Sequence, residues 1–213
     1  MDCIAHHLGL ARVGFIIAAP ATQPRAAGLT GTELLRAARL QAQHGATFVT
    51  ALVTCVTDGE GTPSVHFEAF QASDQAAALA ASGTLVGGHA DPKFVATAPE
   101  RPPVVVAGRD VRAVEVEFLQ CVVPILDHEG PLATRFPVEN RVTHVAGGAD
   151  LQASLVAGKA LPYALRLADF HLLLFLSHAL ALEPDLRLLC GAVAGGGEVA
   201  EGYQFLINAL AGL

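Results

Sequence analysis

The sequence predicts an α+β protein in which a strand-rich part is followed by a helical part. Residues 13–19, 48–56 and 64–70 are short runs rich in apolar and β-branched residues, bounded by Gly, Pro or Asp, which is typical of strands. After the Gly147-Gly148 pair, apolar residues recur every three to four positions, as in helices that bury one face. A chain of 213 residues can form one large domain or two small ones.

A capped helix and a hairpin are predicted after the first strand. Thr30-Gly31-Thr32-Glu33 has the spacing of a capping box, in which the hydroxyl of Thr30 and the carboxylate of Glu33 bind backbone N–H groups at a helix start. The helix is expected to run to about His44, and Gly45 fits the position after its end. Asp58-Gly59-Glu60-Gly61 is a turn sequence between the next two strands, so a β-hairpin is predicted there.

The middle of the chain is predicted to contain a short helix, a connector and two strands. Ser73 can cap a short Ala-rich helix. Residues 87–103 are rich in Pro and Gly and are interpreted as a connector. Residues 104–107 and 118–126 are interpreted as strands, the second bent at Pro124.

Four helices are predicted in the last third of the chain. The first is short and covers residues 150–156. Asp169 can cap the second, which is expected to stop at Pro184. Pro184 also fits the first position of the third helix, which reaches Gly195, and the last helix covers residues 199–210.

Charge and hydropathy exclude several classes of protein. A net charge of −7 without any basic run argues against nucleic-acid binding, because phosphate contacts need clustered Lys and Arg. Hydrophobic residues make up 52% of the chain, which excludes a mainly disordered protein. The mean hydropathy of +0.46 raises the question of a membrane span. However, the longest uniformly apolar stretch near the C-terminus is residues 172–176, far below the roughly 20 residues that a span needs, so a buried core helix is predicted.

The cysteines indicate a reducing compartment. Cys3, Cys55, Cys121 and Cys190 are far apart in sequence and form no C-x-x-C pair, which disfavours a zinc cluster. The first residues lack the pattern of a signal peptide, and this disfavours a disulfide framework. A nucleocytoplasmic protein is therefore expected.

The histidines and one polar turn give no recognisable catalytic or metal site. His6 and His7 would point about 100° apart in a helix, so a surface or capping role explains them better than a shared metal ion. His171 and His178 lack the i, i+4 spacing of metal-binding helices, which favours core or interface roles. Asp127-His128-Glu129 has no nucleophile at a readable spacing, and turn formation explains it more simply.

Three hydrogen-bonding side chains follow an apolar stretch in the segment Phe136-Pro137-Val138-Glu139-Asn140-Arg141. Two interpretations remain open for them. The side chains can satisfy loop backbone groups, or they can form a recognition loop at a strand edge.

Four blocks of the sequence resemble signature blocks of the nuclear protein localization 4 family. They occur in the family's order, and the likeness runs from about Ile4 to the C-terminus. It is greatest to the plant and algal branch, which also ends in a helix like Glu201-Gly202-Tyr203. The blocks are VHFEAFQASD at residues 65–74, ILDHEGPL at residues 125–132, FPVENR at residues 136–141 and DFHLLLFL at residues 169–176.

The resemblance implies a division into two domains. Family members carry an N-terminal ubiquitin-like or UBX-like domain, in many cases zinc fingers, and then an MPN domain and a C-terminal domain. Residues 1–86 are expected to be the later part of an inactive MPN domain, whose sheet and helices are cytidine-deaminase-like. Residues 87–213 are expected to be the C-terminal domain, with strands followed by helices. Because the regions before the MPN domain and its first strands are missing, a truncated member, a fragment or a partial gene model is expected.

The resemblance also implies that the chain is not an enzyme and needs no cofactor. Active MPN proteases bind zinc through a His-x-His-Pro stretch and an Asp three residues after a Ser. Ile17 and Ala19 stand where the histidines would be, and neither can bind a metal. Thr30 and Glu33 fall near the Ser and Asp positions, where a helix cap fits better than a ligand.

The resemblance implies that the chain is an adaptor that binds polyubiquitin, as members of the family do. They act with ubiquitin fusion degradation protein 1 for the AAA ATPase valosin-containing protein, and hold one ubiquitin unfolded along a groove. A degenerate scaffold without ubiquitin binding is the alternative, and a residual hydrolase using Asp127, His128 and Glu129 ranks third. The residues predicted to line the groove are His66, Phe67, Glu68, Phe70, Gln71, Phe136, Glu139, Asn140 and Arg141.

The resemblance implies a location in the cytoplasm and nucleus, with recruitment to the endoplasmic reticulum membrane. Docking to the ATPase is expected to be weak because the N-terminal regions that make this contact are missing. The missing strands are also expected to leave a sheet edge open and to favour self-association.

Overall fold

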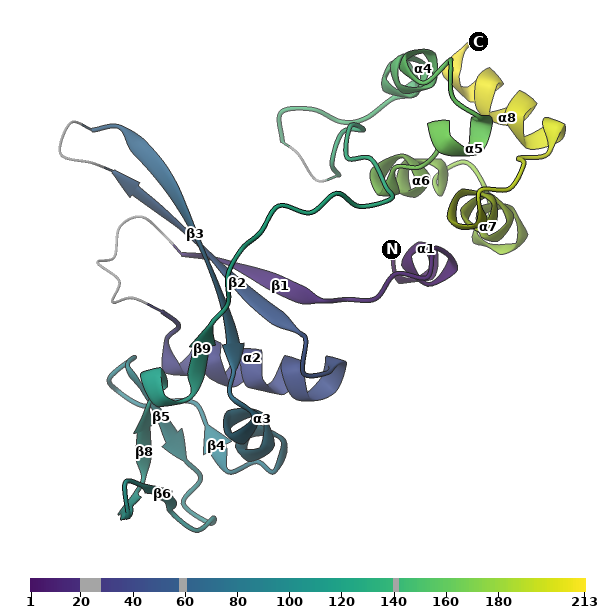
Figure 1. The fold of residues 1–213 in the computed structure, drawn as a ribbon. Coiled ribbons are helices and arrows are strands. Elements are labelled where there is room, and N and C mark those ends of the chain that lie inside the picture. Colours follow the sequence, from purple (N-terminus) through teal and green to yellow (C-terminus); the bar gives the residue numbers. More distant parts are fainter. Residues whose placement is uncertain (20–27, 58–60, 140–141) are drawn as a thin grey trace. The chain divides into compact units, whose positions relative to one another are not determined.

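The chain forms two compact units, each with its own hydrophobic core (Figure 1). The computed structural model describes residues 1–19, 28–57, 61–139 and 142–213. We call Arg12–Asp127 the sheet unit, and Met1–Ala11 together with His128–Leu213 the helical unit. The mixed α+β composition confirms the α+β part of the predicted fold class. The expected domain boundary after residue 86 falls inside the sheet unit.

The main sheet of the sheet unit has the strand order β1-β2-β3-β9. Its strands are β1 (Gly14–Ala19), β2 (Val49–Thr57), β3 (Pro63–Ala72) and β9 (Gln120–Val122). β1 runs parallel to β2, whereas β2 and β3 pair antiparallel, as predicted for the two strands of a hairpin. Residues 58–60 of the predicted turn lie outside the described residues. β9 is shorter than the strand predicted for 118–126, because a 3-10 turn precedes it and residues 123–126 do not continue the strand.

Helix α2 (Gly31–His44) begins as predicted, with both halves of the capping box formed. The backbone N–H of Thr30 donates to Glu33 Oε2 at 2.8 Å, and Gly45 follows the helix with a φ of 114°, which glycine adopts readily. The buried Gln41 ties α2 to the end of β3, since its amide donates to the Ala72 carbonyl at 2.8 Å and accepts from the Ala72 N–H at 2.9 Å. Apolar side chains of α2 pack under the sheet at Leu34, Leu35, Ala37 and Ala38.

The remaining elements of the sheet unit correct one prediction. Helix α3 (Asp74–Ala81) is capped by Ser73, as predicted. The interpretation of 87–103 as a connector is wrong in part, because it contains β5 (Phe94–Thr97), whose alternate residues Val95 and Thr97 are buried. Two small sheets contain β4 (Leu85–Val86), β5 and β8 (Ala113–Glu115), and β6 (Val104–Val106) with β7 (Arg109–Val111).

The helical unit is built from short helices around a leucine-rich core. The helices are α1 (Asp2–His7), α4 (Gly148–Ala157), α5 (Tyr163–Arg166), α6 (Phe170–Leu176), α7 (Arg187–Gly195) and α8 (Glu201–Ala211), with a π-turn η2 (Leu182–Leu186) before α7. Leu172, Leu173 and Leu176 are fully buried, which confirms that the apolar stretch is a core helix. Within the described ranges, no helix combines the length and hydropathy that a bilayer span requires.

The ends of α6 and α7 differ from the prediction at Pro184. α6 ends at Leu176, and Ser177 is its C-cap residue. The hydroxyl of Ser177 donates to the Leu174 carbonyl at 2.6 Å. α7 begins at Arg187, so Pro184 lies in the π-turn before it and is not its first residue.

Candidate functional site

The main sheet presents one apolar face that α2 and α3 do not cover. Side chains alternate between the faces of a strand, and those on the α2 side, such as Thr50, Leu52 and Phe70, are buried. The opposite face carries side chains that pair across β1, β2 and β3 and are mostly solvent-accessible. We call it the open face; it consists of Ile16, Ala18, Ala51, Val53, Cys55, Val65 and Phe67.

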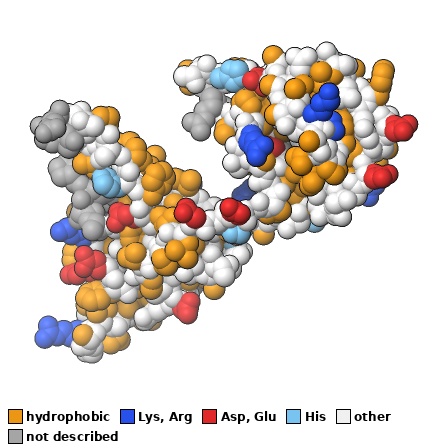
Figure 2. All heavy atoms as spheres, turned by 45° about the horizontal axis from the view of Figure 1, so that its top comes forward, with side chains coloured by type: hydrophobic (Ala, Val, Ile, Leu, Met, Phe, Trp, Pro, Cys, Tyr) orange, Lys and Arg blue, Asp and Glu red, His pale blue; other side chains and the backbone are white. Residues whose placement is uncertain are grey.

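Large apolar side chains make up the exposed area of the open face. The exposed fractions are 68% for Ile16, 53% for Val65 and 61% for Phe67. Figure 2 shows that hydrophobic side chains occupy much of one side of the sheet unit. Single exposed apolar residues are ordinary on protein surfaces, but a contiguous group across three strands is typical of a binding surface.

The outer half of β3 also has an unpaired edge. β3 pairs with β2 along its length, but its other side pairs with β9 only at Phe70–Ala72. In the part of the chain that the structure describes, no strand lies beside residues 64–68 on that side. An extended segment of another chain can therefore add to the sheet there, next to the open face.

The predicted groove residues on β3 divide into exposed and structural ones. His66, Phe67 and Glu68 are exposed, with Phe67 on the open face and the other two on the opposite face. Phe70 lies in the core at 1% exposure. Gln71 is half-buried, and its amide donates to the carbonyl of Ala46 at 2.9 Å.

The other predicted groove residues that the structure describes belong to the helical unit. Phe136 is buried in its core, with its ring centroid 5.4 Å from that of Phe175. Glu139 Oε2 lies 2.8 Å from His171 Nδ1, while its Oε1 is buried without a hydrogen-bond partner among the described residues. Asn140 and Arg141 lie outside the described residues. Because the candidates belong to two units, a single groove formed by all of them stays a prediction.

Comparison with known proteins shows similarity to one family along the full length of this chain. The chain is 38% identical over 220 residues to an NPL4-like protein of Oryza sativa subsp. japonica, covering 100% of this chain and 52% of that protein. It is 39% identical over 216 residues to NPL4-like protein 1 of Arabidopsis thaliana, covering 99% of this chain and 51% of that protein. This chain belongs to the NPL4 family. The finding confirms the predicted resemblance to the plant branch.

Similarity extends to a more distant member of the NPL4 family. The nuclear protein localization protein 4 homolog of Dictyostelium discoideum is 30% identical over 213 residues, which cover 98% of this chain and 35% of that protein. The chain thus spans about half the length of the plant relatives that it matches. Comparison with protein-family models gives no match.

In this NPL4-family chain, the positions compared with zinc ligands have structural roles. Ile17 and Ala19 of β1 pack against the core under the sheet. Thr30 and Glu33 form the cap of α2, as predicted. No group of three His, Cys, Asp or Glu side chains suited to a metal ion occurs among the described residues.

Other polar candidates form contacts that the sequence does not reveal. His7 Nε2 lies 3.2 Å from Cys3 Sγ and 3.1 Å from Glu183 Oε1, whereas His6 has no hydrogen bond among the residues described. Of the predicted surface or capping role, the surface alternative is wrong for His7, because its side chain is only 12% exposed. The Asp127-His128-Glu129 side chains are exposed, and within the described ranges they form no hydrogen bond or ion pair.

The thiol in the helical core is unsuited to nucleophilic chemistry. Cys190 of α7 is fully buried. Burial, followed by the nearby Cys3, raises the pKa of the Cys190 thiol to about 11. The thiol is therefore protonated at neutral pH, and the thiolate that attacks substrates or binds metals is scarce.

Proposed function

We propose that this chain acts as a non-catalytic ubiquitin-binding adaptor within the NPL4 family. In this proposal it works with ubiquitin fusion degradation protein 1 as a cofactor of the ATPase valosin-containing protein in ubiquitin-dependent degradation. The observation that carries the proposal is the open face beside the unpaired edge of β3. Family membership supports the choice of ubiquitin as the ligand.

The geometry of β3 suits an unfolded segment better than a folded surface. An extended chain added at residues 64–68 gains backbone hydrogen bonds with the free edge of the strand. Its alternate side chains can then pack on Val65 and Phe67. Covering the exposed part of Phe67 contributes about 1–2 kcal/mol, from about 25 cal/mol per Å² of apolar area buried. Affinity therefore depends on several such contacts together.

The domain assignment is part of the same proposal. We infer that residues 1–86 correspond to the later part of an inactive MPN domain, and residues 87–213 to the C-terminal domain of the family. The compact units are defined by contacts and the proposed domains by homology, so their boundaries differ. Residues 87–127 pack with the main sheet but belong to the proposed C-terminal domain. The residues of the proposed groove on β3 lie on the MPN side of this boundary.

Titration of the isotope-labelled chain with polyubiquitin, followed by NMR, tests the proposal. Chemical-shift changes are expected at residues 64–68 and at the open-face residues Ile16 and Val53. Phe67→Ser is expected to weaken binding at least fivefold, since the side chain is exposed and its loss spares the core. Phe118→Ser is the matched control, because Phe118 is 65% exposed and lies in the 3-10 turn before β9.

Two results would contradict this site. Equal loss of affinity in both Phe→Ser variants would place binding elsewhere, and polyubiquitin binding without shifts on β3 would do the same. Complete absence of ubiquitin binding would leave the scaffold alternative. In that case the open face would serve a different partner.

The wider cellular role is proposed from the family alone. We expect the chain to occur in the nucleus and cytoplasm, with recruitment to the endoplasmic reticulum membrane through its partners. The chain spans about half the length of its plant relatives, and its partnership with valosin-containing protein is proposed from the family alone. A pull-down in which the chain retains no ATPase would contradict this partnership.

A further inference from the structure

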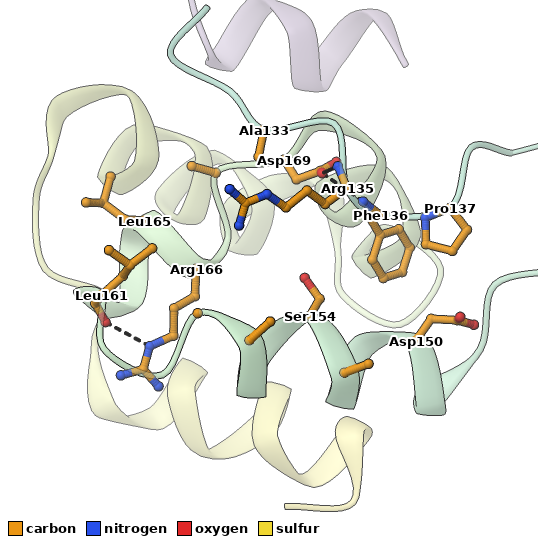
Figure 3. Close-up of a pocket in the computed structure, with 14 residues that line it drawn as sticks. Ala133, Arg135, Phe136, Pro137, Asp150, Ser154, Leu161, Leu165, Arg166 and Asp169 are labelled. Carbon is orange, nitrogen blue, oxygen red and sulfur yellow. Dashed lines mark hydrogen bonds between the residues drawn. The ribbon is translucent and has the colours of Figure 1, made fainter.

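The helical unit contains a pocket of about 310 Å³ that the proposed function does not use (Figure 3). Its walls are the segment 133–137, α4, the loop that leads into α5, α5 itself and residues 168–169. The Ala133 N–H donates to the Ala168 carbonyl at 2.7 Å, which holds the first wall in place. The volume lies at the low end of the roughly 300–1,000 Å³ typical of ligand pockets, so the pocket suits a small group or a few side chains.

The acidic side chains of this pocket already have partners. The Asp169 carboxylate accepts four backbone N–H groups, two from the start of α6 and two from residues 135 and 136. Asp150 accepts from the Gly147 N–H at 2.8 Å and lies 3.0 Å from His144 Nε2. Gly147 is the main cause of the lowered pKa of Asp150, so this carboxylate is ionised and engaged at neutral pH. Neither acid is available as a free acceptor for a cationic ligand.

Two polar donors of the pocket have no partner. Across the described ranges, the guanidinium of Arg135 and the hydroxyl of Ser154 form no hydrogen bond or ion pair. Figure 3 shows Ser154 pointing from α4 into the space beside the Arg135 side chain. Free donors that face a pocket, with the neighbouring acids already satisfied, are complementary to an anion.

A second cation is fixed at the pocket rim. Arg166 donates from Nε to the Leu161 carbonyl and from Nη2 to the Lys159 carbonyl, both at 2.9 Å. Its guanidinium also lies 5.4 Å from the Tyr163 ring centroid. A Cβ at Gly158 would lie 3.1 Å from Arg166 Cγ, so glycine leaves room for this arrangement. No carboxylate pairs with Arg166 in the part of the chain described, and its charge adds to that of Arg135.

The remaining wall of the pocket is aliphatic. Leu161 and Leu165 are 45% and 47% exposed, although both line the pocket. Their apolar area disfavours a strongly hydrated phosphate as the whole ligand, because it would strip water from the anion without replacing it. A ligand that carries an anion and an aliphatic group side by side matches both walls.

We propose that this pocket binds an extended peptide segment that carries a carboxylate next to a branched aliphatic side chain. The carboxylate contacts Arg135 and Ser154, where a guanidinium forms two parallel hydrogen bonds with a carboxylate. The aliphatic side chain packs on Leu161 and Leu165. This site lies within the helical unit, so a test of it is independent of a test of the open face of the sheet unit.

Binding of short labelled peptides to the full chain tests the inference. The probe is an N-acetylated, C-amidated hexapeptide with a central Glu-Leu pair, and its Glu→Gln counterpart is the first control. Fluorescence anisotropy is expected to show at least fivefold weaker binding of the Gln peptide. Arg135→Gln is expected to weaken binding of the Glu peptide by a similar factor, while Arg109→Gln, an exposed arginine on β7, leaves it unchanged. Arg135→Gln keeps the backbone N–H that binds Asp169, so the fold is preserved.

A double-mutant comparison makes the carboxylate contact specific. The Gln peptide is expected to bind wild type and Arg135→Gln equally, because the interaction is already lost. A hexapeptide with a free C-terminal carboxylate after Leu distinguishes a chain end from an acidic side chain. Tighter binding of a phosphoserine peptide than of the Glu peptide would overturn the assignment to a carboxylate. Equal binding of the Glu and Gln peptides, or no binding, would overturn the site itself.

Discussion

Replacement of Asp169 by alanine should destabilise the helical unit strongly. The side chain is 4% exposed, and one carboxylate both caps α6 and holds the segment before Pro137. Loss of an N-cap costs about 1 kcal/mol, within a range of about 0.5–2 kcal/mol. The Phe136 N–H, which donates to Asp169 Oδ2 at 3.0 Å, would remain buried without a partner, at about 1–3 kcal/mol. The expected loss in the free energy of unfolding is therefore about 2–4 kcal/mol.

The asparagine variant separates the two roles of Asp169. The side chain of the Asp169→Asn variant keeps one carbonyl oxygen for the cap, but its amide nitrogen cannot accept from the N–H groups of Arg135 and Phe136. A smaller loss of about 1–3 kcal/mol is expected. Asp110→Ala is the control, since the exposed side chain of this aspartate on β7 forms no hydrogen bond among the described residues and its loss should change stability by less than about 0.5 kcal/mol.

Urea unfolding followed by circular dichroism measures these differences. With a slope of about 1–3 kcal/mol per M, the midpoint for Asp169→Ala should fall by about 1–2 M. Hydrogen exchange adds the location, because protection should be lost first at the Phe136 amide and the first turn of α6. An unchanged midpoint, or lost protection confined to the main sheet, would refute this account of Asp169.

Three further outcomes are expected. Gln41→Leu should lower the free energy of unfolding by about 2–4 kcal/mol in urea titration, because both backbone groups of β3 that it binds become buried without partners. Gly31→Ala should lower the thermal midpoint, since the added Cβ would clash with the Phe94 carbonyl oxygen, and a wild-type midpoint would contradict that packing. Thiol reagents at neutral pH should label the exposed Cys55 quickly and Cys190 only on unfolding. The raised pKa of Cys190 contributes stability in full below about pH 9, and this is lost as pH rises through about 11.

Local signals predict the helix starts because the contacts that form them lie within a few residues. The capping box at Thr30, the Ser73 cap and the Asp169 cap are all of this kind. The second role of Asp169 could not be predicted, because its contact with Phe136 spans 33 positions in sequence. β5 was not predicted for a similar reason: four residues between Pro92 and Pro99 become a strand only through pairing with β4 and β8.

The candidate site shows the same limit in its aromatic residues. Phe67 and Phe70 lie three positions apart on one strand, and therefore on opposite faces of the sheet. Their residue type and spacing predict that one is buried and the other is not, but not which one. The choice depends on where α2 packs, and that contact joins parts of the chain far apart in sequence. The sequence pattern thus predicts the strand itself, while the structure shows that Phe70 is in the core and Phe67 is exposed.

The apolar open face also accounts for part of the high mean hydropathy without a membrane span. Ile16, Val65 and Phe67 add apolar residues to the composition but little to the core, because each is more than half exposed. A protein that retained such side chains only for stability would gain nothing from them, since burial, and not residue type, supplies the hydrophobic free energy. Polar substitutions on the open face should therefore leave the free energy of unfolding nearly unchanged while reducing self-association and ligand binding together. If Phe67→Ser destabilised the fold as much as a core substitution, the face would be structural, and the adaptor proposal would lose its main support.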